Sequence, residues 1–226
     1  MWFPTVWLFL MLLLTPFFAV ASSTTAVPKV TPLHSGKTIA LTFDDGPYGT
    51  STQEVLSILQ KEKIHATFFL VGQNVAEFPQ EAQQIVAEGN TIGNHTYTHT
   101  LLSKLSTSDA LEDISKAESE IASTTGIHTH LFRPPYGILP KALKRELRIQ
   151  GYQIKMWNDD PSDWNYATST SKLIVNRVLA QKKPHTILIL HDGRDTHLNY
   201  PRDNMLQALP IIIEDLENLG YTFVTL

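Results

Sequence analysis

The chain has 226 residues, of which 42% are hydrophobic and 18% are charged, and this composition is typical of a globular protein with one sizeable core. Its net charge of −4 and its pI of about 6.1 come without any block of lysine or arginine, so nucleic acid and acidic membrane surfaces are excluded as main partners. The sequence contains no cysteine, which excludes disulfide bonds and a lipid anchor on cysteine.

The N-terminal segment differs from the rest of the chain. Residues 1–21 carry no charged side chain, include a short apolar run and end in Ala19-Val20-Ala21, a small-x-small cleavage pattern. This pattern predicts a secretory signal peptide that is cleaved after Ala21, so the mature protein is expected to be secreted, periplasmic or attached to the cell wall. An uncleaved membrane anchor is the alternative, although the run is short for a membrane span. Residues 22–36, rich in Ser, Thr and Pro, are predicted to form a short linker.

From Lys37 onward, short β-prone runs alternate with stretches of helical periodicity. Strict alternation of this kind predicts parallel strands joined by right-handed helical crossovers. About seven such units predict one α/β domain over residues 37–226, built as a distorted or incomplete (β/α) barrel, with a doubly wound open sheet as the alternative. In the first helix, Ser51 and Glu54 have the spacing of a capping box. The expected strands are 38–43, 66–71, 91–94, 130–133, 153–157, 186–190 and 221–225, and the expected helices are 51–63, 78–89, 106–126 and 204–220.

Five of the expected strands are followed directly by clusters of ionisable or aromatic residues, whereas the strands themselves are apolar. The carboxyl ends of parallel strands all face the same edge of the sheet, so these clusters are expected to converge. One such cluster would mean little, but five together indicate a functional site. The clusters are Asp44-Asp45, Gly93–His99 (GNHTYTH), Arg133–Gly137 (RPPYG), Trp157–Trp164 (WNDDPSDW) and His191–Gly193 (HDG).

His95 and His99 have the His-x3-His spacing that lets two ligands on one turn of chain bind the same metal ion. By itself this spacing also fits paired surface histidines, and the DDGP at 44–47 also fits a plain turn. The Asp45 carboxylate would complete three ligands and leave one position open, as at a catalytic ion. The ion would keep two adjacent carboxylates ionised, which leaves Asp44 as the base that takes a proton from the attacking water. Zn²⁺ suits such ligands, with Co²⁺, Ni²⁺ and Mn²⁺ as alternatives.

In this order, the five clusters resemble the five motifs of the polysaccharide deacetylase family, also called the NodB-homology or carbohydrate esterase family 4 domain. The resemblance is carried by TFDDG at 42–46, HTYTH at 95–99 and RPPYG at 133–137, and it covers about residues 37–226. It implies the NodB-homology fold and a metal-dependent hydrolase acting on acetylated glycans. The first aspartate of TFDDG would be the catalytic base in such an enzyme, and this residue is Asp44.

The same resemblance implies further roles. Arg133 would orient the Asp44 carboxylate, and the backbone N–H of Tyr136 would help to hold the oxyanion of the tetrahedral intermediate. His191 would be the general acid that protonates the leaving amine, and Asp163 would pair with it and raise its pKa. The implied metal ligands are Asp45, His95 and His99, and the implied substrate pocket is formed by Trp164, Ile189, Pro134 and Pro135.

Two positions depart from the pattern of the family. Ile189 stands two residues before His191, where the family usually has leucine, and this is a mild change in pocket shape. Asp159 stands where an apolar residue is commoner and adds a charge near the site. This second departure leaves open whether Asp160 or Asp163 is the partner of His191.

Several other polar and aromatic residues need an interpretation. Trp157 is interpreted as a core residue, and His197 in the loop after His191 is open between a substrate contact and plain solvation, as are its neighbours Arg194 and Asp195. Tyrosines in the strand-end loops could equally stack on sugar faces or not. Histidines at the starts of expected strands, on the edge opposite the clusters, are interpreted as solvated. The tyrosines are Tyr48, Tyr97, Tyr136 and Tyr166, and the solvated histidines are His65, His128, His130 and His185.

The sequence therefore predicts a metal-dependent enzyme that removes N-acetyl groups from an N-acetylglucosamine polymer, such as peptidoglycan or a chitin-like chain. An acetylated glycan is the expected partner, nucleic acid is not, no protein partner is evident, and a monomer is expected. One alternative is an O-acetyl esterase acting on a xylan-type glycan. Another is a catalytically silent carbohydrate-binding protein, which would be expected to lack one of the five motif residues named for the base, the acid and the metal.

Overall fold

The computed structural model describes residues 1–2, 36–193 and 202–226. The chain divides into two units, Met1–His34 and Ser35–Leu226, and the described helices and strands all belong to the second unit. The predicted signal peptide beyond Trp2, the linker up to residue 35, and the loop with Arg194, Asp195 and His197 lie outside the described residues. None of the helices in the described ranges has the length and apolar character needed to cross a bilayer.

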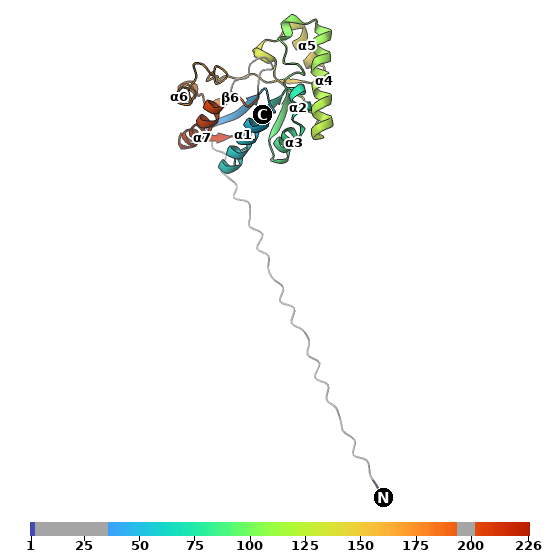
Figure 1. Ribbon diagram of the computed structural model, residues 1–226, viewed down its shortest axis with the longest axis vertical. Helices are drawn as coiled ribbons and strands as arrows, with labels where there is room; N and C mark the ends of the chain where they lie inside the picture. Colours follow the sequence, from blue (N-terminus) through green and yellow to red (C-terminus); the bar gives the residue numbers. More distant parts are fainter. Residues whose placement is uncertain (3–35, 194–201) are drawn as a thin grey trace. The chain divides into compact units, whose positions relative to one another are not determined.

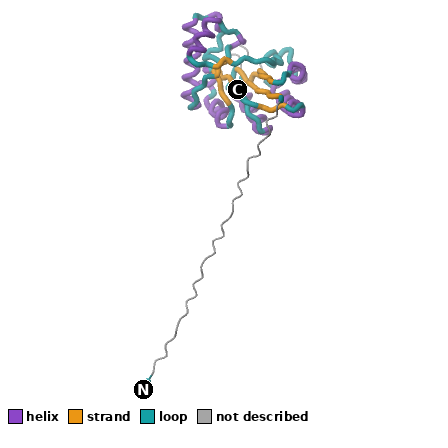
Figure 2. Tube along the Cα trace, turned by 180° about the vertical axis from the view of Figure 1, so that it is seen from behind, coloured by secondary structure: helices purple, strands orange, loops and turns teal. Residues whose placement is uncertain are grey.

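Seven parallel strands form a single curled sheet in the described part of the chain, so the predicted α/β barrel-like architecture is confirmed. The order across the sheet is β5-β4-β3-β2-β1-β6, and β7 pairs with the start of β1. The strands appear in Figure 2 as a central group surrounded by helices. Their bounds are β1 Lys37–Asp44, β2 Thr67–Leu70, β3 Thr91–Asn94, β4 Leu131–Phe132, β5 Gln153–Ile154, β6 His185–His191 and β7 Tyr221–Phe223.

The fifth strand is shorter than the expected 153–157, because the chain leaves β4 after Lys155 and crosses to the opposite edge of the sheet. The Lys155 N–H still donates to the Phe132 carbonyl of β4, at 2.9 Å. Farther along, Asp159 forms an isolated parallel bridge with Leu188 of β6, and its carbonyl accepts from the Ile189 N–H at 3.1 Å. This crossing segment therefore connects β5 at one end of the strand order to β6 at the other.

Seven α-helices and two short 3₁₀ turns lie in the described residues and cover the sheet. In Figure 1, α4 and α5 lie on one flank, and α6 and α7 lie on the other. Four helices match the expected ranges, whereas α2, α5 and α6 are outside the four ranges that we expected. The bounds are α1 Gly49–Glu62, α2 Gly72–Glu77, α3 Pro79–Ala87, α4 Thr107–Thr125, α5 Lys141–Ile149, α6 Ser171–Gln181 and α7 Asp203–Asn218, with 3₁₀ turns at η1 Leu102–Lys104 and η2 Pro135–Gly137.

The expected capping box of α1 is wrong. The helix begins at Gly49, and the Ser51 hydroxyl donates to the backbone carbonyl of Tyr48 instead of accepting from the helix, at 3.0 Å. The Thr52 hydroxyl makes the hydrogen bonds at the start of the helix: it accepts from the Tyr48 N–H at 2.7 Å and donates to Asp192 at 2.6 Å. The start of α1 is therefore tied to the end of β6.

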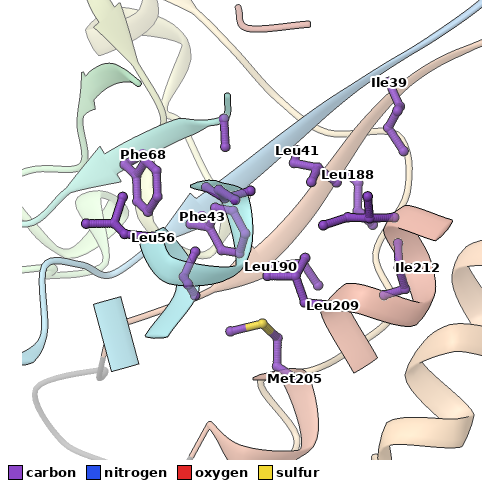
Figure 3. Close-up of a cluster of buried hydrophobic side chains, with 14 of the residues drawn as sticks. Ile39, Leu41, Phe43, Leu56, Phe68, Leu188, Leu190, Met205, Leu209 and Ile212 are labelled. Carbon is purple, nitrogen blue, oxygen red and sulfur yellow. The ribbon is translucent and has the colours of Figure 1, made fainter. Parts of the chain in front are cut away.

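The main hydrophobic core lies between the sheet and the helices α1, α3, α6 and α7, and Figure 3 shows a part of it. Alternation along β1 sends Ile39, Leu41 and Phe43 into this core, while Thr42 and Asp44 take the opposite face. Full burial of a large aliphatic or aromatic side chain contributes about 1.5–3 kcal/mol. The alternation therefore anchors β1 firmly, and the polar residues of β1 face the interior of the curled sheet.

Candidate active site and metal centre

The two adjacent carboxylates Asp44 and Asp45 both line one cleft at the carboxyl end of β1. The alternating pleat of a strand would point neighbouring side chains to opposite faces. The Asp45 side chain does not follow this alternation, because its backbone is left-handed, with φ of 71°. Aspartate tolerates this conformation better than most residues. The turn continues with the Gly46 carbonyl, which accepts from the Val71 N–H at 2.8 Å.

Asp45, His95 and His99 form a buried group of three side chains that could hold a metal ion. The Asp45 Oδ1 atom lies 3.5 Å from His95 Nε2 and 3.1 Å from His99 Nε2. The Nδ1 atom of His95 lies 2.8 Å from the Arg133 carbonyl, to which it can only donate, so Nε2 is left to bind a cation. The loop that carries both histidines is shaped by left-handed backbone at Thr96 and His99, with φ of 68° and 55°.

These three side chains fit a zinc ion. Ligands at about 2.0–2.1 Å from a tetrahedral zinc lie roughly 3.3 Å from one another, which agrees with the Asp45–histidine distances. One carboxylate and two imidazoles also match the donors of catalytic zinc sites with three protein ligands. The sequence-based expectation of a site at Asp45, His95 and His99 therefore agrees with the geometry of the protein.

Asp44 is held by Arg133, which is fully buried. The Arg133 Nη1 atom donates to Asp44 Oδ1 at 2.7 Å and to the Thr42 hydroxyl at 2.8 Å. Its Nε–H donates to the Lys155 carbonyl at 3.1 Å, and the guanidinium lies 4.0 Å from the Phe69 ring centroid. Burial lowers the pKa of Arg133, and the Asp44 carboxylate opposes this change, so the pair is a buried ion pair with one fixed geometry.

His191 at the end of β6 is paired with Asp163, which answers the question left open between Asp160 and Asp163. Asp163 Oδ1 accepts from His191 Nδ1 at 2.8 Å, and Asp163 Oδ2 accepts from the His191 backbone N–H at 2.9 Å. Burial opposes a charged imidazole, but the Asp163 carboxylate and the Asp45 charge outweigh it and raise the pKa of His191 to about 9. Asp160 instead accepts from the Ser162 N–H at 2.7 Å.

The cleft has a volume of about 390 Å³ and brings together side chains from all five motif clusters. Tyr136 lies in the turn Pro135–Gly137 with a left-handed φ of 59°, and its ring centroid is 4.9 Å from that of His99. The described residues that line the cleft are Asp44, Asp45, His95, His99, Tyr136, Trp157, Asp160, Trp164, Ile189, His191 and Arg202.

Some predicted site residues lie outside the lining, and two lining residues were not expected. Pro134 and Pro135 are buried and are not among the described lining residues. Trp157, which we interpreted as core, is half-buried and lines the cleft. Arg202, just before α7, also lines the cleft. It belongs to none of the five clusters, and no spacing in the sequence marks it as a site residue.

The histidines interpreted as solvated do lie on the surface. The residues His65, His128, His130 and His185 are all exposed. His128 Nδ1 lies 3.3 Å from the Glu118 carboxylate, and His185 Nδ1 lies 3.0 Å from the Thr38 hydroxyl. Neither contact brings them near the cleft, so they play no part in the site.

Asp159 lies in the crossing segment and is not among the described residues that line the cleft. Its side chain is buried, and neither carboxylate oxygen has a hydrogen-bond partner among the described residues. Burial, assisted by the negative charge of Asp160, raises the pKa of Asp159 to about 7. The folded protein therefore binds a proton that the unfolded chain releases near pH 4, so this residue lowers stability as the pH rises from about 4 to about 7.

We expect Asp159→Val to stabilise the protein by about 1–3 kcal/mol at pH 8, because it removes two buried polar atoms without partners. The gain should shrink as the pH falls toward 4, where Asp159 is protonated in both states. Urea unfolding of parent and variant at pH 4, 6 and 8 measures both effects. An equal or lower stability of the variant at pH 8 would contradict this reading of Asp159.

The comparisons with known proteins agree with this geometry. The polysaccharide deacetylase family matches residues 33–154. The peptidoglycan-N-acetylmuramic acid deacetylase PdaC of Bacillus subtilis is 36% identical over 189 residues, which is 84% of this chain and 38% of PdaC. A bifunctional xylanase/deacetylase of Pseudobutyrivibrio xylanivorans is 38% identical over 206 residues, 91% of this chain and 32% of that protein. The chain thus spans only about a third of the length of these two relatives.

Solved structures show the same fold. The structure of PdaC from Bacillus subtilis has a TM-score of 0.75 and 35% identity, and the match covers 85% of this chain and 89% of that one. A family 4 carbohydrate esterase from Streptomyces lividans has a TM-score of 0.74 and 32% identity, with 84% and 92% coverage. Together with the family match, these likenesses show that the chain belongs to the polysaccharide deacetylase family.

Proposed function

We propose that this protein is a metal-dependent deacetylase that removes N-acetyl groups from a polysaccharide containing N-acetylglucosamine, with peptidoglycan as the first candidate. One observation carries the proposal: Asp44 and His191 line the same cleft as the three side chains that could hold a metal ion. Hydrolysis of an amide needs a base for the attacking water, a positive centre for the carbonyl oxygen and an acid for the leaving amine. The cleft contains a candidate group for each of these three roles.

In this proposal, Asp44 is the base that takes the proton from the attacking water. The charge-assisted hydrogen bond from Arg133 points one Asp44 oxygen away from the cleft, and the other oxygen, Oδ2, lies 3.6 Å from His95 Nε2. Asp44 Oδ2 therefore faces the metal ligands, where the attacking water has to bind. A divalent ion held by Asp45, His95 and His99, most simply Zn²⁺, would supply Lewis acidity at this place. The backbone N–H of Tyr136 is the proposed second donor to the oxyanion.

His191 is the proposed acid that gives its proton to the leaving nitrogen. Its Nδ1 atom is bonded to Asp163, so its Nε2–H is the proton that can be given away. With a pKa of about 9, His191 is charged at neutral pH. An amine leaves with difficulty unless it is protonated, whereas an alcohol leaves more readily. An acid that is charged at neutral pH therefore meets the need of an N-acetyl substrate.

We expect Asp163→Asn to move the alkaline limb of the pH–kcat profile by at least one pH unit toward lower pH. The proton-donating form of His191 is present below its pKa, and the loss of the Asp163 charge lets burial lower that pKa. Steady-state rates between pH 6 and 10 for parent and variant measure the shift. An unchanged alkaline limb would show that His191 is not the acid or that Asp163 does not tune it.

The substrate would be bound by the aromatic side chains at the rim of the cleft. Tyr136 and Trp164 line the cleft and are 48% and 49% exposed, and we propose that their rings contact the sugar. A relative named a deacetylase of peptidoglycan-N-acetylmuramic acid supports a cell-wall glycan as substrate. The relative named a bifunctional xylanase/deacetylase is the observation that supports an O-acetylated xylan as the second candidate.

The proposal includes the organisation of the chain. Residues 1–21 act as a signal peptide or membrane anchor, residues 22–36 as a linker and residues 37–226 as the catalytic domain. Export fits a substrate outside the cytoplasm. A monomeric enzyme acting on an acetylated glycan is part of the proposal. The five motif residues Asp44, Asp45, His95, His99 and His191 are all present, which argues against a silent binding protein.

The experiment that tests the function is acetate release by the purified full chain with added zinc, from chitooligosaccharides, peptidoglycan and acetylated xylan in parallel. Acetate release from chitooligosaccharides or peptidoglycan, abolished by a chelator and restored by zinc, would support the N-deacetylase. Release from xylan alone would move the function to the O-acetyl esterase. Zinc binding without release from any of the three would contradict the proposal for these substrates.

A further inference from the structure

Arg202 stands at the N-terminal boundary of α7 and is nine-tenths buried, yet it lines the cleft. Its Nη2 atom lies 3.8 Å from Asp45 Oδ2, and its Nε–H donates to the Gly193 carbonyl at 2.7 Å. The guanidinium therefore joins two strand ends, because Asp45 follows β1 and Gly193 follows β6. A planar guanidinium with several donors can contact two acceptors at once in a fixed geometry.

The Gly193 contact reaches Asp45 as well. A Cβ atom on Gly193 would lie 1.8 Å from the Asp45 carbonyl oxygen, so only glycine lets the two backbones pack this closely. The same Asp45 carbonyl accepts from Asn74 Nδ2 at 2.6 Å. The left-handed backbone of Asp45 is thus enclosed by Asn74 and Gly193, while Arg202 holds Gly193 on one side and faces the Asp45 carboxylate on the other.

The two oxygens of Asp45 have different surroundings. Oδ1 lies 3.5 Å and 3.1 Å from the Nε2 atoms of His95 and His99, and Oδ2 is the oxygen next to Arg202. We propose that Arg202 is a positioning residue for the metal site: it holds Asp45 so that Oδ1 alone is presented with the two histidines. This inference rests on the proposed metal site and concerns its assembly, not the reaction.

Arg202 has two opposing effects on a bound cation. Its positive charge repels the ion, which by itself would weaken metal binding. The attraction between its charge and Oδ2, 3.8 Å away, favours the carboxylate orientation in which Oδ1 lies beside the two histidines. Removal of a group that orients a metal ligand typically costs about 10–100-fold in affinity or activity. The guanidinium is paired with Oδ2, whereas Oδ1 is the oxygen beside the two histidines, so we expect the positioning effect to dominate.

The test is the zinc dissociation constant of the full chain, measured by competition with a chromophoric chelator. We expect Arg202→Gln to raise this constant at least tenfold. Arg202→Lys keeps a positive charge but replaces the planar guanidinium, which contacts Gly193 and Asp45 through different nitrogens, by a single ammonium, so an intermediate loss is expected. Arg177→Gln is the matched control, because Arg177 also donates to a backbone carbonyl, that of Pro161 at 2.9 Å, and does not contact a metal ligand.

The outcomes separate clearly. Weaker zinc binding in the Arg202 variants, with the control equal to the parent, supports the positioning role. Equal or tighter zinc binding by Arg202→Gln overturns it, since simple charge repulsion predicts tighter binding. If Arg202→Gln does not fold, as judged by near-UV circular dichroism, the Arg202→Lys variant decides. Weaker zinc binding by this variant supports the proposal, and equal or tighter binding overturns it. Failure of the parent to bind zinc overturns the metal site itself, and absence of deacetylase activity alone leaves the zinc result intact.

Discussion

Asp44→Asn is expected to lower kcat by about 10²–10⁴-fold while zinc binding is retained. General base catalysis by a positioned side chain contributes an effect of this size. The amide oxygen of asparagine can still accept the hydrogen bond from Arg133 Nη1 that now joins Asp44 Oδ1 at 2.7 Å, so the local structure should persist. The amide cannot accept a proton from water. The variant therefore removes the proposed chemistry with little change in shape.

The measurement is the initial rate of acetate release at saturating substrate, together with the zinc dissociation constant of the same preparation. Glu54→Gln on the exposed face of α1 is a suitable control, because it removes a carboxylate of a surface helix. A variant with more than a tenth of the parent rate would contradict the role of Asp44 as base. Loss of zinc binding as well would mean that Asp44 acts through the metal site.

Arg133→Met is expected to destabilise the protein by about 3–5 kcal/mol and to lower activity. Arg133 has no exposed surface and balances the Asp44 charge, which is also buried. Removal of one partner of a buried ion pair leaves an uncompensated charge, and this is the costly change. Methionine fills part of the volume beside Phe69 without any charge.

The double variant Asp44→Leu with Arg133→Met provides the control. Replacement of both partners by apolar groups leaves no unpaired charge, so the double variant should be more stable than Arg133→Met alone. Urea unfolding of the parent and of the single and double variants measures these differences. A single variant within about 1 kcal/mol of the parent would show that water or another group compensates Asp44.

The class of fold could be predicted because its signals are local. The longest strands, β1 and β6, carry their own apolar residues, and β1 shows the alternation of Ile39, Leu41 and Phe43 that places one face in the core. The helix α4 has its serine cap at Ser106 and its left-handed glycine at Gly126 within its own sequence. Such elements are specified by neighbours along the chain.

Other features depend on contacts between distant segments. The end of β5 could not be placed from its sequence, because it is decided by the backbone hydrogen bonds of Asp159 with Ile187 and Ile189 on β6. The start of α1 was misjudged for the same reason, since Thr52 finds its partner in Asp192, 140 residues away. Hydrogen bonds of this kind leave no periodic signal in the sequence.

The sequence by itself determined the family motifs, the order along the chain of the five polar clusters that follow the strands, and the three side chains suited to a metal ion. Only the tertiary structure decided that Asp163 and not Asp160 is bonded to His191, that Trp157 lines the cleft and that Arg202 faces Asp45. The physical reason is that the type of a residue and its spacing in the sequence limit the contacts that it is able to make. Which contact forms is decided by the packing of the whole sheet, because burial removes water as the competing partner.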